Sequence, residues 1–81
     1  MTDSSKPANM LDLKGLLCPL PVVRIAQAIK TVAIGEKVEA VATDPGVLAD
    51  IPAWARSTGN ELVLIEKKDN KEIRFVVKRL K

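Results

Sequence analysis

The 81-residue chain lacks histidine and tyrosine and contains a single cysteine, Cys18. One cysteine cannot form a disulfide within the chain, and without histidine the chain has too few ligands for the usual zinc sites. Aromatic residues are also scarce: Trp54 and Phe75 are the two present. Proteins that read RNA sequence normally stack bases on several aromatic side chains. These absences argue against a disulfide scaffold, a metal centre and direct base recognition, and they leave the purpose of one thiol to be explained.

Long hydrophobic runs are missing as well. No segment approaches the roughly 18 apolar residues of a membrane span, and the opening MTDSSKPANM lacks the apolar core of a secretory signal. With 47% apolar and 28% charged residues, the composition is typical of a globular protein. We therefore expect a flexible tail at residues 1–9 and a single domain at residues 10–81. We also expect a monomer in the reducing cytoplasm, where a free thiol stays available, with no membrane partner.

Charge is spread unevenly along the chain. Residues 67–81 carry a net charge of +5, whereas the whole chain carries +3. One interpretation is a solvated β-hairpin whose lysines prevent edge-to-edge pairing of strands. The other is a docking surface for an acidic protein or RNA. Both interpretations stay open at this point.

Hydrophobic periodicity predicts six elements. Alternation predicts strands, helical spacing predicts helices, and the turns coincide with glycine, asparagine or aspartate. We predict strands at 10–14, 37–43, 61–67 and 72–80, and helices at 19–31 and 45–58. Pro52 lies inside the second helix and is expected to kink it or tighten its first turn. The order βαβαββ predicts an α+β fold, a two-layer sandwich in which both helices cover one face of a mixed four-stranded sheet.

The segment GLLCPLPVVR, residues 15–24, places the thiol at a helix start. Proline is favoured at the first helical position, which makes Pro19 that position and Cys18 the N-cap. The positive helix end, with Lys14 or Arg24 nearby, is expected to lower the pKa of the thiol below its free value of about 8.5. Pro19 and Pro21 would hold the thiol in a stiff turn. The alternative is a buried cysteine that only fills space.

Two known thiol chemistries do not fit this segment. The spacing from Cys18 to Arg24 matches a phosphate-binding loop, but Pro19 and Pro21 have no N–H groups to offer a phosphate. A dithiol mechanism fails because Pro21 occupies the position of the second cysteine. A lone thiolate can still take the outer sulfur of a persulfide and yield it to another thiol. A reactive Cys18 would therefore suit a carrier that works with other proteins, while the interpretation as a buried structural cysteine stays open.

Three stretches carry a resemblance to a known family: the motif Cys18-Pro19-Leu20-Pro21, the pair Asp44-Pro45, and the run DIPAWARSTGNELV at residues 50–63. From about Leu11 onward, the chain resembles the TusA/SirA family of small sulfur carriers. The resemblance implies a two-layer sandwich akin to the C-terminal domain of translation initiation factor three. It also implies sulfur held on Cys18 as a persulfide, without cofactor or metal. The implied partners are a cysteine desulfurase or another persulfide donor, and an acceptor protein that serves tRNA thiolation, sulfur oxidation, molybdenum-cofactor or selenium metabolism.

Two further residues are candidates for the site. Asp44 is expected to cap the second helix, contributing about 1 kcal/mol, and its match to the family pair suggests that it also shapes the site near Cys18. Arg24 projects from the first helix about six residues after the cysteine and is a candidate for partner docking. The alternative function is a non-catalytic regulatory or RNA-associated module that uses the basic C-terminal hairpin, with Cys18 merely structural.

Overall fold

The computed structural model describes residues 10–81; the tail expected at residues 1–9 lies outside the described residues. The elements follow the predicted order βαβαββ. They are β1 (Met10–Leu13), α1 (Leu20–Ile29), β2 (Lys37–Ala42), α2 (Val47–Thr58), β3 (Glu61–Lys67) and β4 (Ile73–Lys78).

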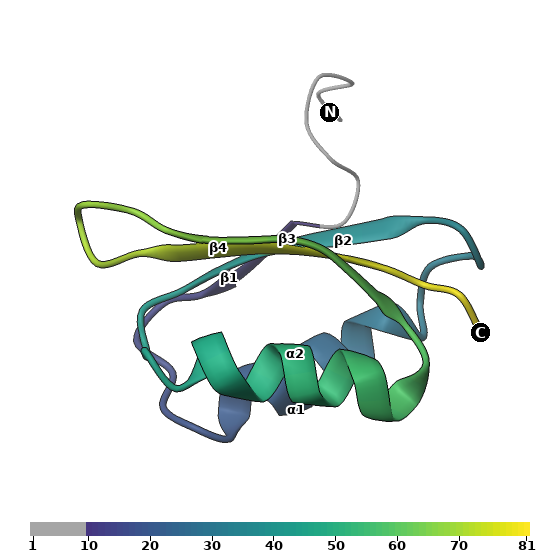
Figure 1. Ribbon diagram of the computed structural model, residues 1–81, viewed down its shortest axis with the longest axis horizontal. Helices are drawn as coiled ribbons and strands as arrows, with labels where there is room; N and C mark the ends of the chain where they lie inside the picture. The colour runs from purple at the N-terminus through teal and green to yellow at the C-terminus, as the bar shows by residue number, and fades with distance from the viewer. Residues whose placement is uncertain (1–9) are drawn as a thin grey trace.

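The four strands form one mixed sheet in the order β1-β2-β4-β3. β1 and β2 are parallel, whereas β4 runs antiparallel to both β2 and β3. Figure 1 shows the sheet as one layer and the two helices as the other, on the same face of the sheet. Both helices begin at the same end of the sheet, because each follows a strand of the parallel pair. The predicted two-layer α+β sandwich is confirmed.

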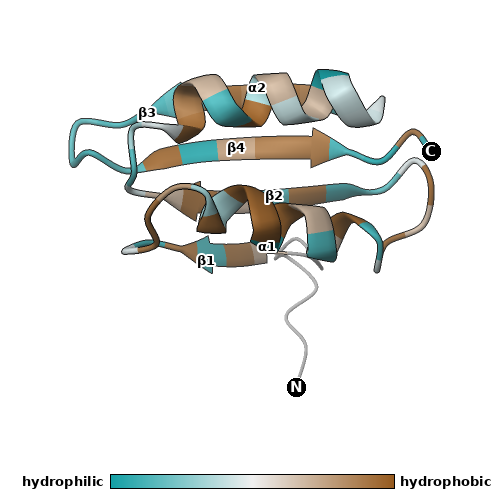
Figure 2. Ribbon diagram, turned by 90° about the horizontal axis from the view of Figure 1, so that it is seen from below, coloured by the Kyte–Doolittle hydropathy of each residue, from teal (hydrophilic) through white to brown (hydrophobic). Residues whose placement is uncertain are grey.

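The core lies between the sheet and the two helices. Along β4 the residues alternate between buried and half-buried, with Ile73, Phe75 and Val77 facing the helices. Ile25 of α1 and Ile51 of α2 meet them and are fully buried. Figure 2, which views the molecule from the helix side, shows apolar residues on both helices and an apolar stretch of β4 between them. This packing fixes the positions of the helices, and therefore of the residues at their first turns.

The opposite face of the sheet carries an ion-pair group. Arg74 of β4 bonds to Glu39 of β2 through Nε and to Glu66 of β3, where Nη1 lies 3.1 Å from Oε2. Cross-strand pairs of opposite charge stabilise a sheet. One of the cations in the basic C-terminal segment is thus matched by two carboxylates.

The structure corrects the starts of both helices. α1 begins at Leu20 with Pro19 as its N-cap, so Cys18 lies one residue before the cap, not on it. α2 has Gly46 as its N-cap in place of Asp44. Pro19 has φ −98° and ψ 16°, outside the helical region, so the regular helix α1 starts one residue later than predicted.

The first turn of α2 is tight, and the kink or tightening expected at Pro52 stays a prediction. The N–H groups of Leu48 and Ala49 donate to the carbonyls three residues earlier, at 3.1 Å in both cases. The helix ends at Gly59, which has the left-handed φ of 77° that glycine adopts without steric cost. No helix within residues 10–81 is long and apolar enough to cross a membrane.

Candidate functional site

The site lies where β1 and β2 end. Parallel neighbours finish at the same edge of a sheet, so the loops that follow them meet there. Leu13 and Ala42, the last residues of the two strands, are direct partners in the register. The Gly15 N–H donates to Thr43 Oγ1 at 2.9 Å, which joins the two loops. Residues 28 positions apart in the sequence are thereby brought into contact.

Asp44 ties the cysteine loop to the start of α2. The Cys18 N–H donates to Asp44 Oδ2 at 2.6 Å, and the Gly46 N–H donates to Asp44 Oδ1 at 3.1 Å. One carboxylate therefore holds the backbone on both sides of the site. The expected nearness of Asp44 to Cys18 is present, although Asp44 acts through a turn before the helix and not as its N-cap.

Asp50 completes the surroundings of the thiol. The Cys18 Sγ–H donates to Asp50 Oδ2 at 2.9 Å. The carboxylates of Asp44 and Asp50 both lie next to Gly46. A Cβ atom at Gly46 would be 3.5 Å from Asp44 Oδ1 and 3.7 Å from Asp50 Oδ2. The sequence analysis missed Asp50. Asp50 is the acidic residue in the first turn of α2, and only the fold brings that turn to Cys18.

The environment of the thiol corrects the expected direction of its pKa. Cys18 is exposed, as a reactive thiol requires. The hydrogen bond to Asp50, partial desolvation, and the negative charges of Asp50 and Asp44 raise the pKa of Cys18 above its ordinary value. The prediction of a lowered pKa was wrong because it counted the helix end and neighbouring cations but not the carboxylates that the fold brings in.

Two prolines, Pro19 and Pro21, follow the thiol in the chain. Pro19 is the N-cap of α1, and the Cys18–Pro19 peptide bond is cis. Pro21 is fully buried and anchors the first turn of α1 in the core. The leucines around them behave differently, since Leu17 is 71% exposed and Leu20 is 46% exposed. The thiol thus sits on a turn flanked by apolar side chains that face solvent.

The two cations considered near the thiol lie elsewhere. The Lys14 ammonium is 3.9 Å from the carboxylate of Glu72. Arg24 is exposed on α1 and lines an open groove with Asp12 of β1 and Gln27 and Thr31 of the α1 side. The charged groups that act on Cys18 are the two aspartates.

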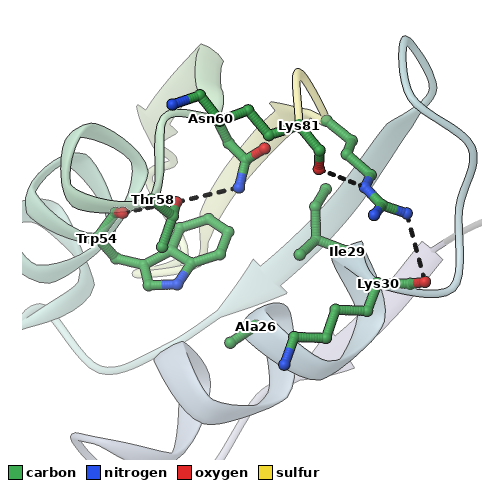
Figure 3. Close-up of a pocket in the computed structure, with 8 residues that line it drawn as sticks. Ala26, Ile29, Lys30, Trp54, Thr58, Asn60 and Lys81 are labelled. Carbon is green, nitrogen blue, oxygen red and sulfur yellow. Dashed lines mark hydrogen bonds between the residues drawn. The ribbon is translucent and has the colours of Figure 1, made fainter.

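A second cleft lies at the other end of the helix pair, between the last turns of α1 and α2 (Figure 3). Its volume is about 310 Å³, and Trp54 forms one wall. Arg79 also lines this cleft. Its guanidinium group donates hydrogen bonds to the backbone carbonyl oxygens of Val32 at 2.6 Å and Lys81 at 2.7 Å. The cleft shares no lining residue with the thiol site, and its first lining residue on α1, Ala26, lies eight residues after Cys18.

Chemically, the site offers one nucleophile and two carboxylates. Within residues 10–81, no three His, Cys, Asp or Glu side chains are grouped so that they could hold a metal ion. The arrangement can donate or accept a proton at Sγ through Asp50, and it can form a covalent bond at Sγ with a group carried by another molecule.

The fold and the site define a small α+β protein that presents a single thiol at the junction of two helix starts. The family model for "Sulfurtransferase TusA" matches residues 9–79. The chain belongs to the TusA family.

Relatives and a solved structure agree with this assignment. The sulfur carrier protein TusA of Allochromatium vinosum is 38% identical over 69 residues, which cover 85% of this chain and 90% of that protein. A relative from Aquifex aeolicus is 40% identical over 76 residues, which cover 94% of this chain but 39% of the longer Aquifex protein. The crystal structure of a SirA-like protein from Desulfitobacterium hafniense superposes with a TM-score of 0.77 at 22% identity, covering 89% of this chain and 97% of that chain, and supports the fold.

Proposed function

We propose that this protein carries sulfur as a persulfide on Cys18, receiving it from a donor such as a cysteine desulfurase and passing it to an acceptor protein. The observation that carries the proposal is the exposed Cys18 thiol held at a fixed position between two aspartates. The family match and the relatives named as sulfur carriers support it.

The geometry suits a carrier better than a self-contained enzyme. Cys18 is exposed on a turn and faces solvent, not an enclosed pocket, so a second protein can reach its sulfur. With no second thiol in the chain, a sulfur bound at Sγ cannot be released as an internal disulfide and must leave by attack from another molecule.

The roles of the surrounding residues follow from their contacts. Asp44 fixes the backbone of Cys18, while Pro19 and the buried Pro21 stiffen the turn that presents the sulfur. Arg24 lies on the exposed side of α1 and remains the candidate for docking of a partner. None of these residues needs to touch the transferred sulfur.

The RNA-associated alternative receives less support from the charges. Arg74 is engaged by Glu39 and Glu66, and Arg79 is engaged by backbone carbonyls, so two of the cations in the basic segment are already matched within the protein.

Intact-mass analysis tests the proposal. The protein is incubated with a cysteine desulfurase and cysteine, and we expect the mass of one added sulfur atom, removable by a reducing thiol. Cys18→Ser serves as the control and should gain nothing. A wild-type protein that gains no sulfur from the desulfurase or from a small persulfide donor would overturn the proposal.

A further inference from the structure

The direction of the electrostatics at Cys18 is unusual for a working nucleophile. A thiol reacts as its thiolate, and reactive cysteines generally lie in electropositive surroundings. Here the Sγ–H is bonded to Asp50 at 2.9 Å, and a second carboxylate, Asp44, lies at the backbone of the same residue. Both groups disfavour loss of the proton. The resting thiol is therefore accessible yet weakly reactive.

Among the described residues, the charged groups that act on the sulfur are two carboxylates. Asp50 comes from the first turn of α2, and Asp44 comes from the loop between β2 and α2. Both raise the pKa of the thiol, and no cation offsets them. Cys18 itself contributes the proton.

The surface beside the thiol is apolar and exposed. Leu17 and Leu20 flank Cys18 in the chain, and Val23 follows Leu20 by three residues, which places it on the same side of α1. All three are large apolar side chains that face solvent. A partner protein would cover such a stripe on docking, and the acidic pair beside it would attract a positive group on that partner.

We propose that Asp50 and Asp44 lock Cys18 in its protonated form, and that the lock is opened by a partner protein that sets a cationic side chain against these carboxylates while covering the Leu17–Leu20–Val23 stripe. The proposal rests on the proposed function, because it concerns how sulfur enters and leaves the same thiol. A cation at the carboxylates would reverse their effect, so that the thiolate forms only in the docked complex.

The transfer step balances without an added oxidant or reductant. As Cys18 attacks, a bond forms between Sγ and the outer sulfur of the donor persulfide, and the sulfur–sulfur bond of the donor breaks. The donor's inner sulfur leaves as a thiolate, and the proton from Sγ goes to it or to solvent. The outer sulfur keeps its oxidation state. After the transfer Sγ carries no proton, so its hydrogen bond to Asp50 is lost.

The lock also has a protective consequence. A lone exposed thiolate is prone to oxidation and to disulfide formation with unrelated thiols. Keeping Sγ protonated lowers both reactions in the free carrier without hiding the sulfur from its partner.

Alkylation of the full chain by iodoacetamide at pH 7 tests the lock without using any partner. We expect Asp50→Asn to react faster than wild type, by up to about tenfold for each unit by which the pKa of Cys18 falls. Glu61→Gln changes the net charge equally at the start of β3, beyond the far end of α2, and should match wild type. Equal or slower alkylation of Asp50→Asn would overturn the proposal.

Charged thiol reagents test the sign of the local field on the wild-type protein, and this arm stands even if Asp50→Asn fails to fold. A cationic methanethiosulfonate should modify Cys18 faster than an anionic one of similar size. Added salt should reduce the difference, because screening acts over about 8 Å at physiological ionic strength. Equal rates for the two reagents would contradict the proposed acidic lock.

Loading by a persulfidated cysteine desulfurase tests the partner's part. We expect Asp50→Asn to be loaded no faster than wild type, because the partner's cation has already opened the lock in the wild-type complex. Loading that accelerates as much as alkylation would overturn the claim that the partner supplies a cation. Failure of the proposed function looks different: wild type would then accept no sulfur, while the alkylation results would stand.

Discussion

Cys18 and Asp50 are 32 residues apart in the sequence, and the Sγ–H of the first donates to Oδ2 of the second at 2.9 Å. The contact exists because α1 and α2 both start at one end of the sheet and pack side by side on it. The contact favours the protonated form of the thiol and so lowers the fraction present as the reactive thiolate.

The first prediction concerns the pH dependence of Cys18 reactivity. The alkylation rate, measured across pH, should reach half its maximum above the free thiol value of about 8.5, because Asp50 and Asp44 favour the protonated form. A midpoint below that value would show that the helix end dominates.

The raised pKa of Cys18 also predicts how the stability of the fold depends on pH. The folded protein binds the Cys18 proton more tightly than the unfolded chain does, so this interaction stabilises the fold below the ordinary thiol pKa. The contribution is lost as the pH rises through the raised pKa of the folded thiol. Denaturant unfolding of wild type and Cys18→Ala at neutral and alkaline pH measures it, and the two proteins should converge in stability at alkaline pH.

The second prediction is that Cys18→Ser folds normally. Cys18 is exposed, and a serine hydroxyl can donate to Asp50 as the thiol does. The free energy of unfolding should change by less than about 0.5 kcal/mol, the usual range for surface substitutions. Urea denaturation checks this value. A large loss of stability would mean that the cysteine is structural, which is the alternative that the sequence left open.

The third prediction concerns Asp44→Ala. The carboxylate accepts the N–H groups of both Cys18 and Gly46, so its loss should cost about 1–2 kcal/mol in the free energy of unfolding. Asp12→Ala is the matched control, because Asp12 accepts one local N–H, that of Lys14 two residues away. If both variants lose the same stability, Asp44 does not join the two loops energetically.

The fourth prediction separates two docking surfaces. Arg24→Glu, on the helix that follows the thiol, should slow loading by a desulfurase several-fold, and salt should reduce the difference from wild type. Lys78→Glu on the outer face of the sheet should leave the rate near wild type, because that face points away from both helices. A larger loss for Lys78→Glu would move docking to the hairpin. Arg74 is unsuitable for this comparison, since its ion pairs with Glu39 and Glu66 support the sheet.

The spacing of apolar residues along the sequence was enough to predict the architecture. The alternation of Ile73, Phe75 and Val77 and the helical spacing of Ile25 and Ile29 determine which faces are buried, and the structure has them so. Helix starts were less predictable. The helices were predicted to start at Pro19 and Pro45 but start at Leu20 and Val47, so the prolines located each start only to within one or two residues.

The site was predicted in part for a different reason. Cys18 stands out by being the one thiol, and Asp44 by its place after a strand. Asp50 has no such mark, because an acidic residue in a first helical turn is ordinary. Its importance arises from the pairing of β1 with β2, which no local pattern encodes. The direction of the thiol pKa was therefore mispredicted together with it.

The most direct test follows the sulfur itself. The protein is loaded with radioactive sulfur from labelled cysteine through a desulfurase, its persulfide is trapped by alkylation, and the label is mapped by peptide. The account predicts label on the peptide that contains Cys18, and loss of that label when an acceptor thiol is added before trapping. Label that maps elsewhere, or that stays on Cys18 in the presence of excess acceptor thiol, would contradict the claim that Cys18 carries transferable sulfur.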